Sequence, residues 1–315
     1  MRKQLMRIIS HVFLLIYLCF FYATSVNAEE LKKTEKNAIY LTAEDRSWMV
    51  DFIEKFFLTD TMVYALFGSK PMAGGMICVA SKEECIKSWE SQLKTFSDKE
   101  KVEFLEALNE QTKKDIKLNE NFQKWLQWKK NYPNPPFIFR TSLSEDKHYL
   151  LIDMINIREI LWTLEKNHTV FSRETGMNFN PLEVTLDFGN QDSVFWKKVM
   201  NNQYLLGILY GFGERNSYFF SLYVKMGGKD HVADDYPLFK SYFHEKIPKK
   251  EDEKLSIENL DIPSFGSFCA PLMEDPVITH YKKERELIQK ELKGKDFATE
   301  VLKKLLGKEV AFAPS

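Results

Sequence analysis

The sequence has no excess of charge of one sign. Its 44 lysines and arginines face 45 aspartates and glutamates, which gives a formal net charge of −1. Proteins that hold nucleic acids through their phosphates usually carry a surplus of basic residues, so we expect no nucleic-acid partner. The charged residues are interspersed with apolar ones, and 25 phenylalanines contribute to a hydrophobic fraction of 44%. Most of the chain is therefore expected to fold around a large core.

Recognisable catalytic motifs are also missing. The sequence contains no G-x-S-x-G nucleophile elbow and no G-x-x-x-x-G-K-[ST] phosphate loop. The stretch HEKIP, which begins at His244, lacks the second histidine of the zinc-protease motif H-E-x-x-H, and its proline would break the required helix. Cys269 and His280 could form a thiolate pair, but no third orienting residue is indicated. We therefore expect a noncatalytic protein.

The apolar run near the N-terminus is too short for an ordinary membrane span. It covers residues 12–23, whereas a helix needs about 20 apolar residues to cross a bilayer. A basic head before the run and small residues after it are typical of a secretory signal peptide, so we expect cleavage after residue 28. The residues that define this pattern are Arg2, Lys3, Arg7, Val26 and Ala28. The alternative is an uncleaved anchor over residues 12–26.

Cysteine is scarce, with four residues in the chain. Removal of residues 1–28 leaves Cys78, Cys85 and Cys269. Oxidising compartments favour pairing, and six residues separate Cys78 from Cys85, which makes them the candidate disulfide. The alternative is three reduced thiols that pack as small hydrophobic side chains. If Cys78 and Cys85 form a disulfide, Cys269 is expected to remain outside it.

Helix signals dominate the segment 29–130. Two capping boxes, Ser81 with Glu84 and Ser97 with Glu100, predict that a helix begins after each serine. The apolar pattern then continues until the proline-rich stretch NYPNPP at residues 131–136 ends it. We predict an N-terminal helical subdomain over residues 29–130 and a second region over residues 137–315. The alternative is one continuous domain.

Residues 137–155 predict a β-hairpin. FIFRTSL alternates apolar and polar side chains, HYLLIDMI is rich in strand-forming residues, and SEDK between them is typical of a turn. The competing interpretation is a single helix over residues 145–167, because the apolar residues also fit a helical spacing. With this one hairpin, the predicted fold class is mostly α (α+β).

The C-terminal half predicts further helices. Residues 193–225 are apolar enough for two or three buried helices, after a looser segment at residues 176–190. Residues 227–276 are predicted to form long loops. Two amphipathic helices, joined near Gly294, are expected to close the chain.

The stretch Gly211-Phe212-Gly213-Glu214-Arg215-Asn216 lacks the third glycine of the dinucleotide motif G-x-G-x-x-G. The carboxylate of Glu214 would also repel a diphosphate. We predict instead a corner between two helices. One of the glycines ends the first helix in a left-handed conformation, and Asn216 or Ser217 caps the second. No dinucleotide or other cofactor is expected.

Five polar residues are the first candidates for a hydrolytic site, if the fold brings them into one pocket: Glu214, Arg215, Asp230, His231 and Asp234. Three of them, Asp230, His231 and Asp234, are also the nearest approach to a metal-binding set. Polar loops of this kind are more commonly solvated, so we predict no metal. Scatter of these residues over a convex surface would favour a binding protein.

Three segments carry a resemblance to a known family: VYALFGSKPM (63–72), FWKKVMNNQYLLGILYGFGERNSYFF (195–220) and DIPSFGSF (261–268). They are similar to uncharacterised exported proteins of chlamydia-related intracellular bacteria. The resemblance implies a location in the bacterial envelope and transfers no site residues. Our leading hypothesis is a noncatalytic binding or structural protein, periplasmic or secreted, with a protein or envelope component as partner. The alternatives are an exported hydrolase and a signal-anchored accessory protein of the inner membrane.

Overall fold

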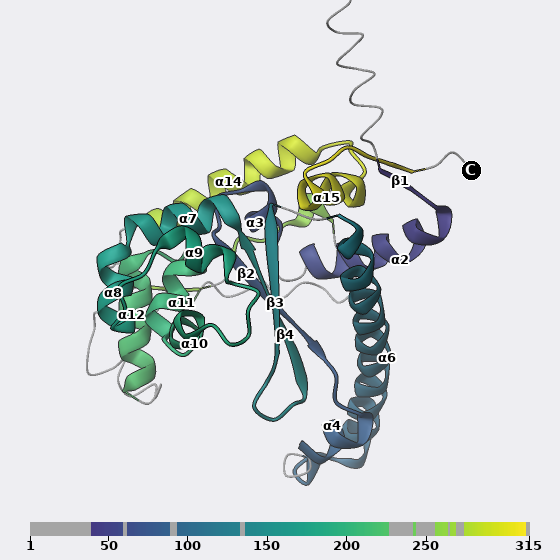
Figure 1. Cartoon of the computed structure of the whole chain (residues 1–315). Coiled ribbons are helices and arrows are strands. Elements are labelled where there is room, and N and C mark those ends of the chain that lie inside the picture. The colour runs from purple at the N-terminus through teal and green to yellow at the C-terminus, as the bar shows by residue number, and fades with distance from the viewer. Residues whose placement is uncertain are drawn as a thin grey trace, which may run out of the picture. The chain divides into compact units, whose positions relative to one another are not determined.

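The computed structural model describes residues 39–58, 62–88, 93–132, 136–226, 242–243, 256–263, 265–268 and 274–312. The chain divides into two units, which are described separately. In the smaller unit, strands β1 (Ile39–Leu41) and β7 (Val310–Phe312) pair in parallel. The structure is mostly helical with a small antiparallel sheet, which confirms the predicted α+β class (Figure 1).

The larger unit, residues 44–307, contains the three-stranded antiparallel sheet. Its strand order is β2-β4-β3, with β2 at Met72–Cys78, β3 at Phe137–Leu143 and β4 at Tyr149–Asn156. The predicted hairpin is confirmed, and the single-helix interpretation of residues 145–167 is wrong. Strand β2 was not predicted, and it pairs with β4 from Met72↔Ile155 to Cys78↔Tyr149. The sheet therefore joins segments from both sides of the proline-rich stretch.

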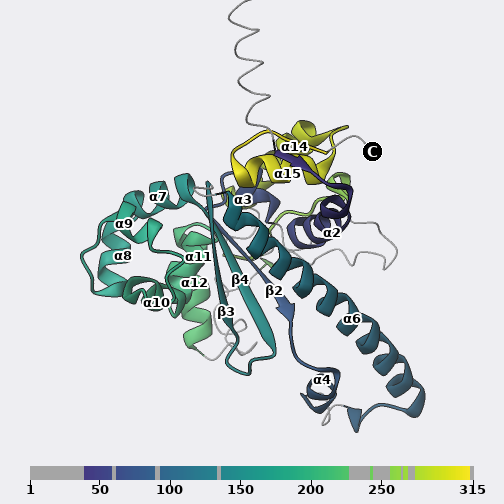
Figure 2. The same ribbon diagram turned by 45° about the vertical axis from the view of Figure 1, so that its right-hand side comes forward.

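Helix α6 (Asp98–Trp128) runs beside the sheet and continues past it to α4 (Lys82–Ser88) (Figure 2). Both predicted capping boxes are confirmed. Ser97 and Glu100 bond reciprocally at the start of α6, and Ser81 and Glu84 do the same at the start of α4. The C-terminal half of α6 buries Trp125, whose ring contacts that of Phe139 at 6.5 Å. This half of α6 therefore packs against the sheet.

The other face of the sheet packs against a group of helices. These are α7 (Ile157–Lys166), α8 (His168–Thr175), α9 (Pro181–Leu186), α10 (Val194–Met200), α11 (Gln203–Leu209) and α12 (Glu214–Lys225). Helices α10 to α12 confirm the prediction for residues 193–225, whereas α9 lies in a segment predicted to be loose. The apolar cluster that they enclose is called the helical core. Its residues are Met72, Ile155, Ile160, Leu164, Phe171, Phe188, Phe195, Trp196, Val199, Tyr204, Leu205, Ile208 and Leu209.

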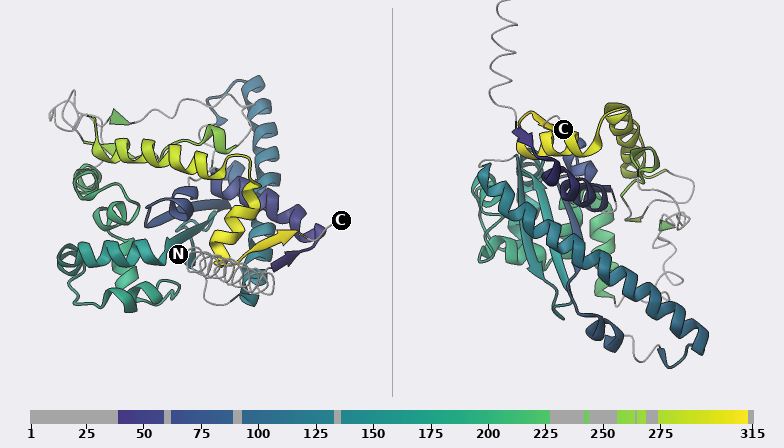
Figure 3. Two further views of the ribbon diagram at one scale, coloured as in Figure 1. Left: turned by 90° about the horizontal axis from the view of Figure 1, so that it is seen from above. Right: turned by 90° about the vertical axis from the view of Figure 1, so that its right-hand side faces the viewer.

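A second cluster, the C-terminal core, forms among α3 (Val63–Phe67), α14 (Pro276–Leu292) and the 3-10 turn Ile257–Asn259. Its residues are Leu58, Val63, Tyr64, Ile257, Leu260, Phe265, Tyr281, Ile288 and Leu292. Helices α14 and α15 (Phe297–Leu306) are the two predicted closing helices, and Gly294 lies between them with φ 73°. Both lie toward the C-terminal end of α6 (Figures 1 and 3).

The remaining elements are short. They are α2 (Ala43–Ile53), the π-helical turn Glu54–Leu58, the 3-10 turn Lys129–Asn131, and the antiparallel pair β5 (Tyr242–Phe243) and β6 (Gly266–Ser267). Strand β6 matters for the site, because it brings residues near 265 against α12.

Candidate ligand-binding site

The glycine corner between α11 and α12 builds one wall of the candidate site. Gly211 and Gly213 both have φ 77°, a conformation that favours glycine. The N–H of Phe212 donates to the carbonyl of Gly207, and the N–H of Gly211 donates to that of Ile208, each at 3.0 Å. This pair of bonds is the Schellman arrangement that ends helices. The predicted corner is confirmed, because a helix and not a strand precedes it.

The predicted cap of α12 is wrong. The helix begins at Glu214, so its N-cap residue is Gly213, and no side chain caps it. Ser217 instead donates its hydroxyl to the carbonyl of Gly213 at 2.6 Å, and Asn216 faces Asp275, the N-cap residue of α14. The positive φ of Gly213 lets the helix start at Glu214, three residues earlier than a cap at Asn216 would give.

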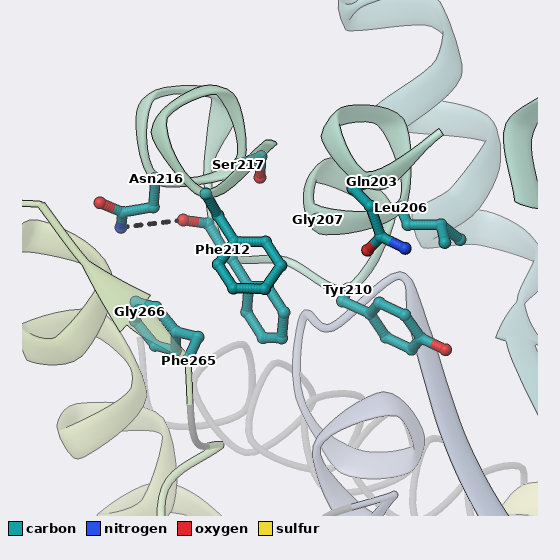
Figure 4. Close-up of a pocket in the computed structure, with 10 residues that line it drawn as sticks. Gln203, Leu206, Gly207, Tyr210, Phe212, Asn216, Ser217, Phe265 and Gly266 are labelled. Carbon is teal, nitrogen blue, oxygen red and sulfur yellow. Dashed lines mark hydrogen bonds between the residues drawn. The ribbon is translucent and has the colours of Figure 1, made fainter. Parts of the chain in front are cut away.

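A cavity of about 330 Å³ lies at this corner (Figure 4). Helices α11 and α12 form two of its sides, and the segment leading into β6 forms a third. The lining residues are Gln203, Leu206, Gly207, Tyr210, Phe212, Asn216, Ser217, Phe220, Phe265 and Gly266.

The cavity wall is largely aromatic. The ring of Phe212 stacks on that of Phe265, with centroids 5.0 Å apart and planes 16° apart. Tyr210 stacks with Phe212 at 5.9 Å and 23°. With Phe220 on α12, four aromatic side chains line the space. Ligand pockets in proteins are typically lined in this way, with few polar groups that fix orientation.

The polar side chains of Asn216 and Ser217 are already hydrogen-bonded within the protein. The amide nitrogen of Asn216 donates to the carbonyl of Phe212 at 3.0 Å and to Asp275 Oδ2 at 2.9 Å, while its oxygen accepts the N–H of Phe268 at 3.1 Å. Asn216 is 4% exposed, so these bonds satisfy an amide that would otherwise be costly to bury. Gln203, by contrast, is exposed on the first turn of α11. Its exposed amide can therefore contact a ligand.

Tyr210 connects the cavity to two charged residues of the sheet, Asp153 and Arg140. Its hydroxyl donates to Asp153 Oδ1 at 3.0 Å. Asp153 lies opposite Gly74 of β2 and Arg140 of β3 in the strand register. Burial raises the pKa of Asp153 to about 6, although the hydrogen bond from Tyr210 and the charge of Arg140 act in the opposite direction.

Gly74 makes room for this contact. A Cβ atom at position 74 would lie 2.6 Å from the hydroxyl oxygen of Tyr210 and 2.9 Å from Asp153 Oδ1. Both distances are shorter than van der Waals contact, so a side chain here would displace the Tyr210–Asp153 pair. Glycine in a strand often marks such a close approach.

The two predicted polar site residues that the structure describes lie outside the cavity lining. Glu214 accepts a hydrogen bond from the hydroxyl of Tyr204 at 3.0 Å, and Arg215 donates to the carbonyl of Phe268. The other predicted residues, Asp230, His231, Asp234, His244 and Cys269, lie outside the described residues. Gln203, Phe265 and Gly266 were not predicted as site residues, although they lie in two segments of the resemblance, 195–220 and 261–268.

The predicted cysteine pair is close in space. The sulfurs of Cys78 and Cys85 lie 3.8 Å apart, as two thiols in contact. The disulfide itself stays a prediction.

His280 accepts or donates a hydrogen bond with the hydroxyl of Ser69 at 2.8 Å, through its Nε2 atom. The same nitrogen is 3.6 Å from Glu284 Oε1. A catalytic triad needs the carboxylate at the other ring nitrogen, so this group does not have triad geometry.

Among the residues that the structure describes, no three His, Cys, Asp or Glu side chains lie together as a possible metal site. No described helix combines the length and the apolar character that crossing a membrane requires. No protein-family model, curated protein or solved structure matches the chain.

Proposed function

We propose that this chain is an exported, noncatalytic binding protein whose corner cavity holds an apolar ligand with an aromatic ring. The observation that carries the proposal is the cavity of about 330 Å³ walled by Tyr210, Phe212, Phe220 and Phe265. Export rests on the signal-peptide pattern of residues 1–28. The resemblance to exported proteins of chlamydia-related bacteria supports a location in the bacterial envelope.

The volume supports a ligand of one or two rings. An apolar cavity of roughly 150 Å³ in a protein core can hold benzene. The corner cavity is about twice that size. Aromatic pairs add roughly 0.5–1.5 kcal/mol beyond the area that they bury, so rings in the wall favour a ring in the ligand.

The lining also supports binding over catalysis. Among the described lining residues, the one side chain that titrates is Tyr210, and burial and Asp153 raise its pKa well above the ordinary value. A group held neutral in this way is a poor general base at neutral pH. The hydrolase alternative depends on Asp230, His231 and Asp234, which lie outside the described residues.

A fluorescence titration with 1-aminonaphthalene, a fluorophore of two rings, tests the site. We expect saturable binding by the wild type. Gln203→Trp places a large side chain at the edge of the cavity and should weaken binding by about tenfold or more, which corresponds to about 1.4 kcal/mol. Gln203→Ala is the matched control, since it removes the same amide without filling space, and should bind within about threefold of the wild type. No saturable binding, or equal affinity of all three proteins, would contradict the proposal.

Export has a separate test. Mass spectrometry of the mature N-terminus from fractionated cells should find a chain that begins at Glu29. An intact N-terminus in the membrane fraction would instead support the signal-anchored alternative.

A further inference from the structure

The segment between β2 and α4 is firmly positioned at the tip of the sheet. Cys78 is the last residue of β2 and lies opposite Tyr149. The N–H groups of Val79 and Ala80 then both donate to the carbonyl of His148, at 2.8 and 3.2 Å. The capping box at Ser81 starts α4 directly after these bonds. The short connection therefore fixes where the first turns of α4 lie relative to the end of β2.

This arrangement brings two thiols together. Cys85 lies in the middle of α4, and its sulfur is 3.8 Å from that of Cys78. A disulfide has a sulfur–sulfur distance of about 2.05 Å, so the two atoms need to approach by about 2 Å, which small side-chain rotations supply. Both side chains are partly exposed, so an oxidant can reach them.

We propose that Cys78 and Cys85 form an intramolecular disulfide in the exported protein, and that this bond fastens α4 to the tip of the sheet. The structure supports a fastening role because α4 is short and mostly exposed. Glu83, Glu84 and Lys87 face solvent, and Ile86 is only half-buried. Short helices with few buried contacts open easily, and a covalent link to β2 prevents that opening.

The oxidant is a protein disulfide of a thiol–disulfide oxidoreductase, or oxidised glutathione. The thiolate of one cysteine attacks the oxidant's disulfide and forms a mixed disulfide, which releases one thiol of the oxidant. The thiolate of the second cysteine then attacks the first cysteine's sulfur and releases the other oxidant thiol. The cysteines lose two protons and two electrons in total, and the oxidant's disulfide becomes two thiols.

The environment of Cys85 disfavours its thiolate. Burial, together with the neighbouring Cys78 thiol, raises the pKa of Cys85 to about 11. At neutral pH Cys85 is therefore almost entirely the thiol, whereas the thiolate is the attacking species. The attack by Cys85 is therefore expected to be slow at neutral pH.

Peptide mapping of the full mature protein tests the link. The protein is made with its signal sequence in a bacterial periplasm, alkylated without reduction, and digested. We expect one species in which the peptides of Cys78 and Cys85 are joined. Its mass should be about 2 Da below the summed masses of the two reduced peptides, because two hydrogens are lost. Cys269→Ser is the matched control and should leave the link intact. Unlinked Cys78 and Cys85 after incubation with oxidised glutathione and an oxidoreductase, or a link from either to Cys269, would overturn the proposal.

Limited proteolysis tests the fastening role. Cleavage within residues 79–88 should be about tenfold slower in the oxidised protein than after reduction, since the link suppresses local opening. In a variant with Cys78→Ser and Cys85→Ser, the reductant should change nothing. Equal cleavage rates of the oxidised and reduced wild type would refute the fastening role, and the peptide map decides the bond itself even if the double variant folds poorly. Neither result depends on ligand binding at the corner cavity.

Discussion

The helical core and the C-terminal core are both rich in aromatic residues, but they treat their polar atoms differently. In the helical core, the indole N–H of Trp196 donates to the carbonyl of Val184 at 2.7 Å. In the C-terminal core, the hydroxyl of Tyr64 is buried without a hydrogen-bond partner among the described residues, and so is Glu284 Oε2 beside it. An unpaired buried polar group costs about 1–3 kcal/mol.

The difference follows from what the C-terminal core supports. Tyr281 lies 5.5 Å from Tyr64 in an edge-to-face pair, yet it donates its hydroxyl to the carbonyl of Gly211 at 3.1 Å. Glu284 Oε1 is likewise engaged, by the N–H of Ser69 at 2.6 Å. The polar groups of this core thus hold the loop after α3 and the glycine corner in place. The C-terminal core thus combines polar atoms that position the glycine corner with two neighbouring polar atoms that are unpaired among the described residues.

Trp196→Ala should have the largest effect, because it empties the centre of the helical core. Trp196 is fully buried and contacts Phe188 and Phe195. We expect the free energy of unfolding to fall by about 3–5 kcal/mol, as for other aromatic truncations. Urea denaturation followed by circular dichroism measures this. A loss smaller than that of Leu292→Ala, a fully buried aliphatic side chain of the C-terminal core, would reverse the comparison.

Asp153→Asn should stabilise the protein at neutral pH and have little effect near pH 4. The fold raises the pKa of Asp153 from 3.8 to about 6, so the folded state binds a proton more tightly than the unfolded state. The free energy of unfolding therefore falls as pH rises from about 4 to 6, by up to about 3 kcal/mol. The asparagine lacks this penalty, so the variant should gain most at pH 7 and little at pH 4.

Asp187→Asn is the matched control for that measurement. Hydrogen bonds from Ser193 and Asn190 lower the pKa of Asp187, so its ionised form is favoured by the fold. Its substitution should weaken the protein above about pH 4, and the effect should fade as pH falls through the lowered pKa of Asp187. If both variants respond to pH with the same sign, the buried position of Asp153 is not what raises its pKa.

Tyr64→Phe should have the smallest effect, and a favourable one. Removal of the unpaired hydroxyl should raise the free energy of unfolding by about 1 kcal/mol, because the aromatic packing stays the same. Tyr281→Phe removes a hydroxyl that is bonded to Gly211 and should lower it by about the same amount. Opposite signs in urea denaturation would sharpen the contrast between a bonded and an unbonded hydroxyl. A loss in both variants would show that Tyr64 has a partner.

The sequence predicted the parts of the fold that depend on near neighbours. Both capping boxes, the hairpin and the glycine corner are set by residues within a few positions of one another. Strand β2 is different, because its partner β4 begins about 70 residues later and its centre is Gly74-Gly75. Glycine is depleted in strands, so local propensity argues against the element that tertiary pairing creates.

The same distinction explains the candidate site. Tyr210 and Phe212 lie in a segment that was predicted to be buried, but the cavity also needs Phe265 and Gly266, which approach from about 50 residues away. No periodicity marks those two residues, and their segment, DIPSFGSF (261–268), was noted only for its resemblance to a family without assigned site residues. Glu214 and Arg215 were selected for their charge, and the structure uses them to bind Tyr204 and the backbone at Phe268.

Gly74 lies in strand β2, outside the cavity lining, yet it affects the position of Tyr210, which lines the cavity. The missing side chain lets the Tyr210 ring settle with its hydroxyl against β4, and the other side of that ring is a wall of the pocket. A side chain at position 74 should displace the ring of Tyr210. The backbone hydrogen bonds between β2 and β4 should remain. If the cavity binds the proposed ligand, a substitution at Gly74 should change the affinity although Gly74 does not line the cavity.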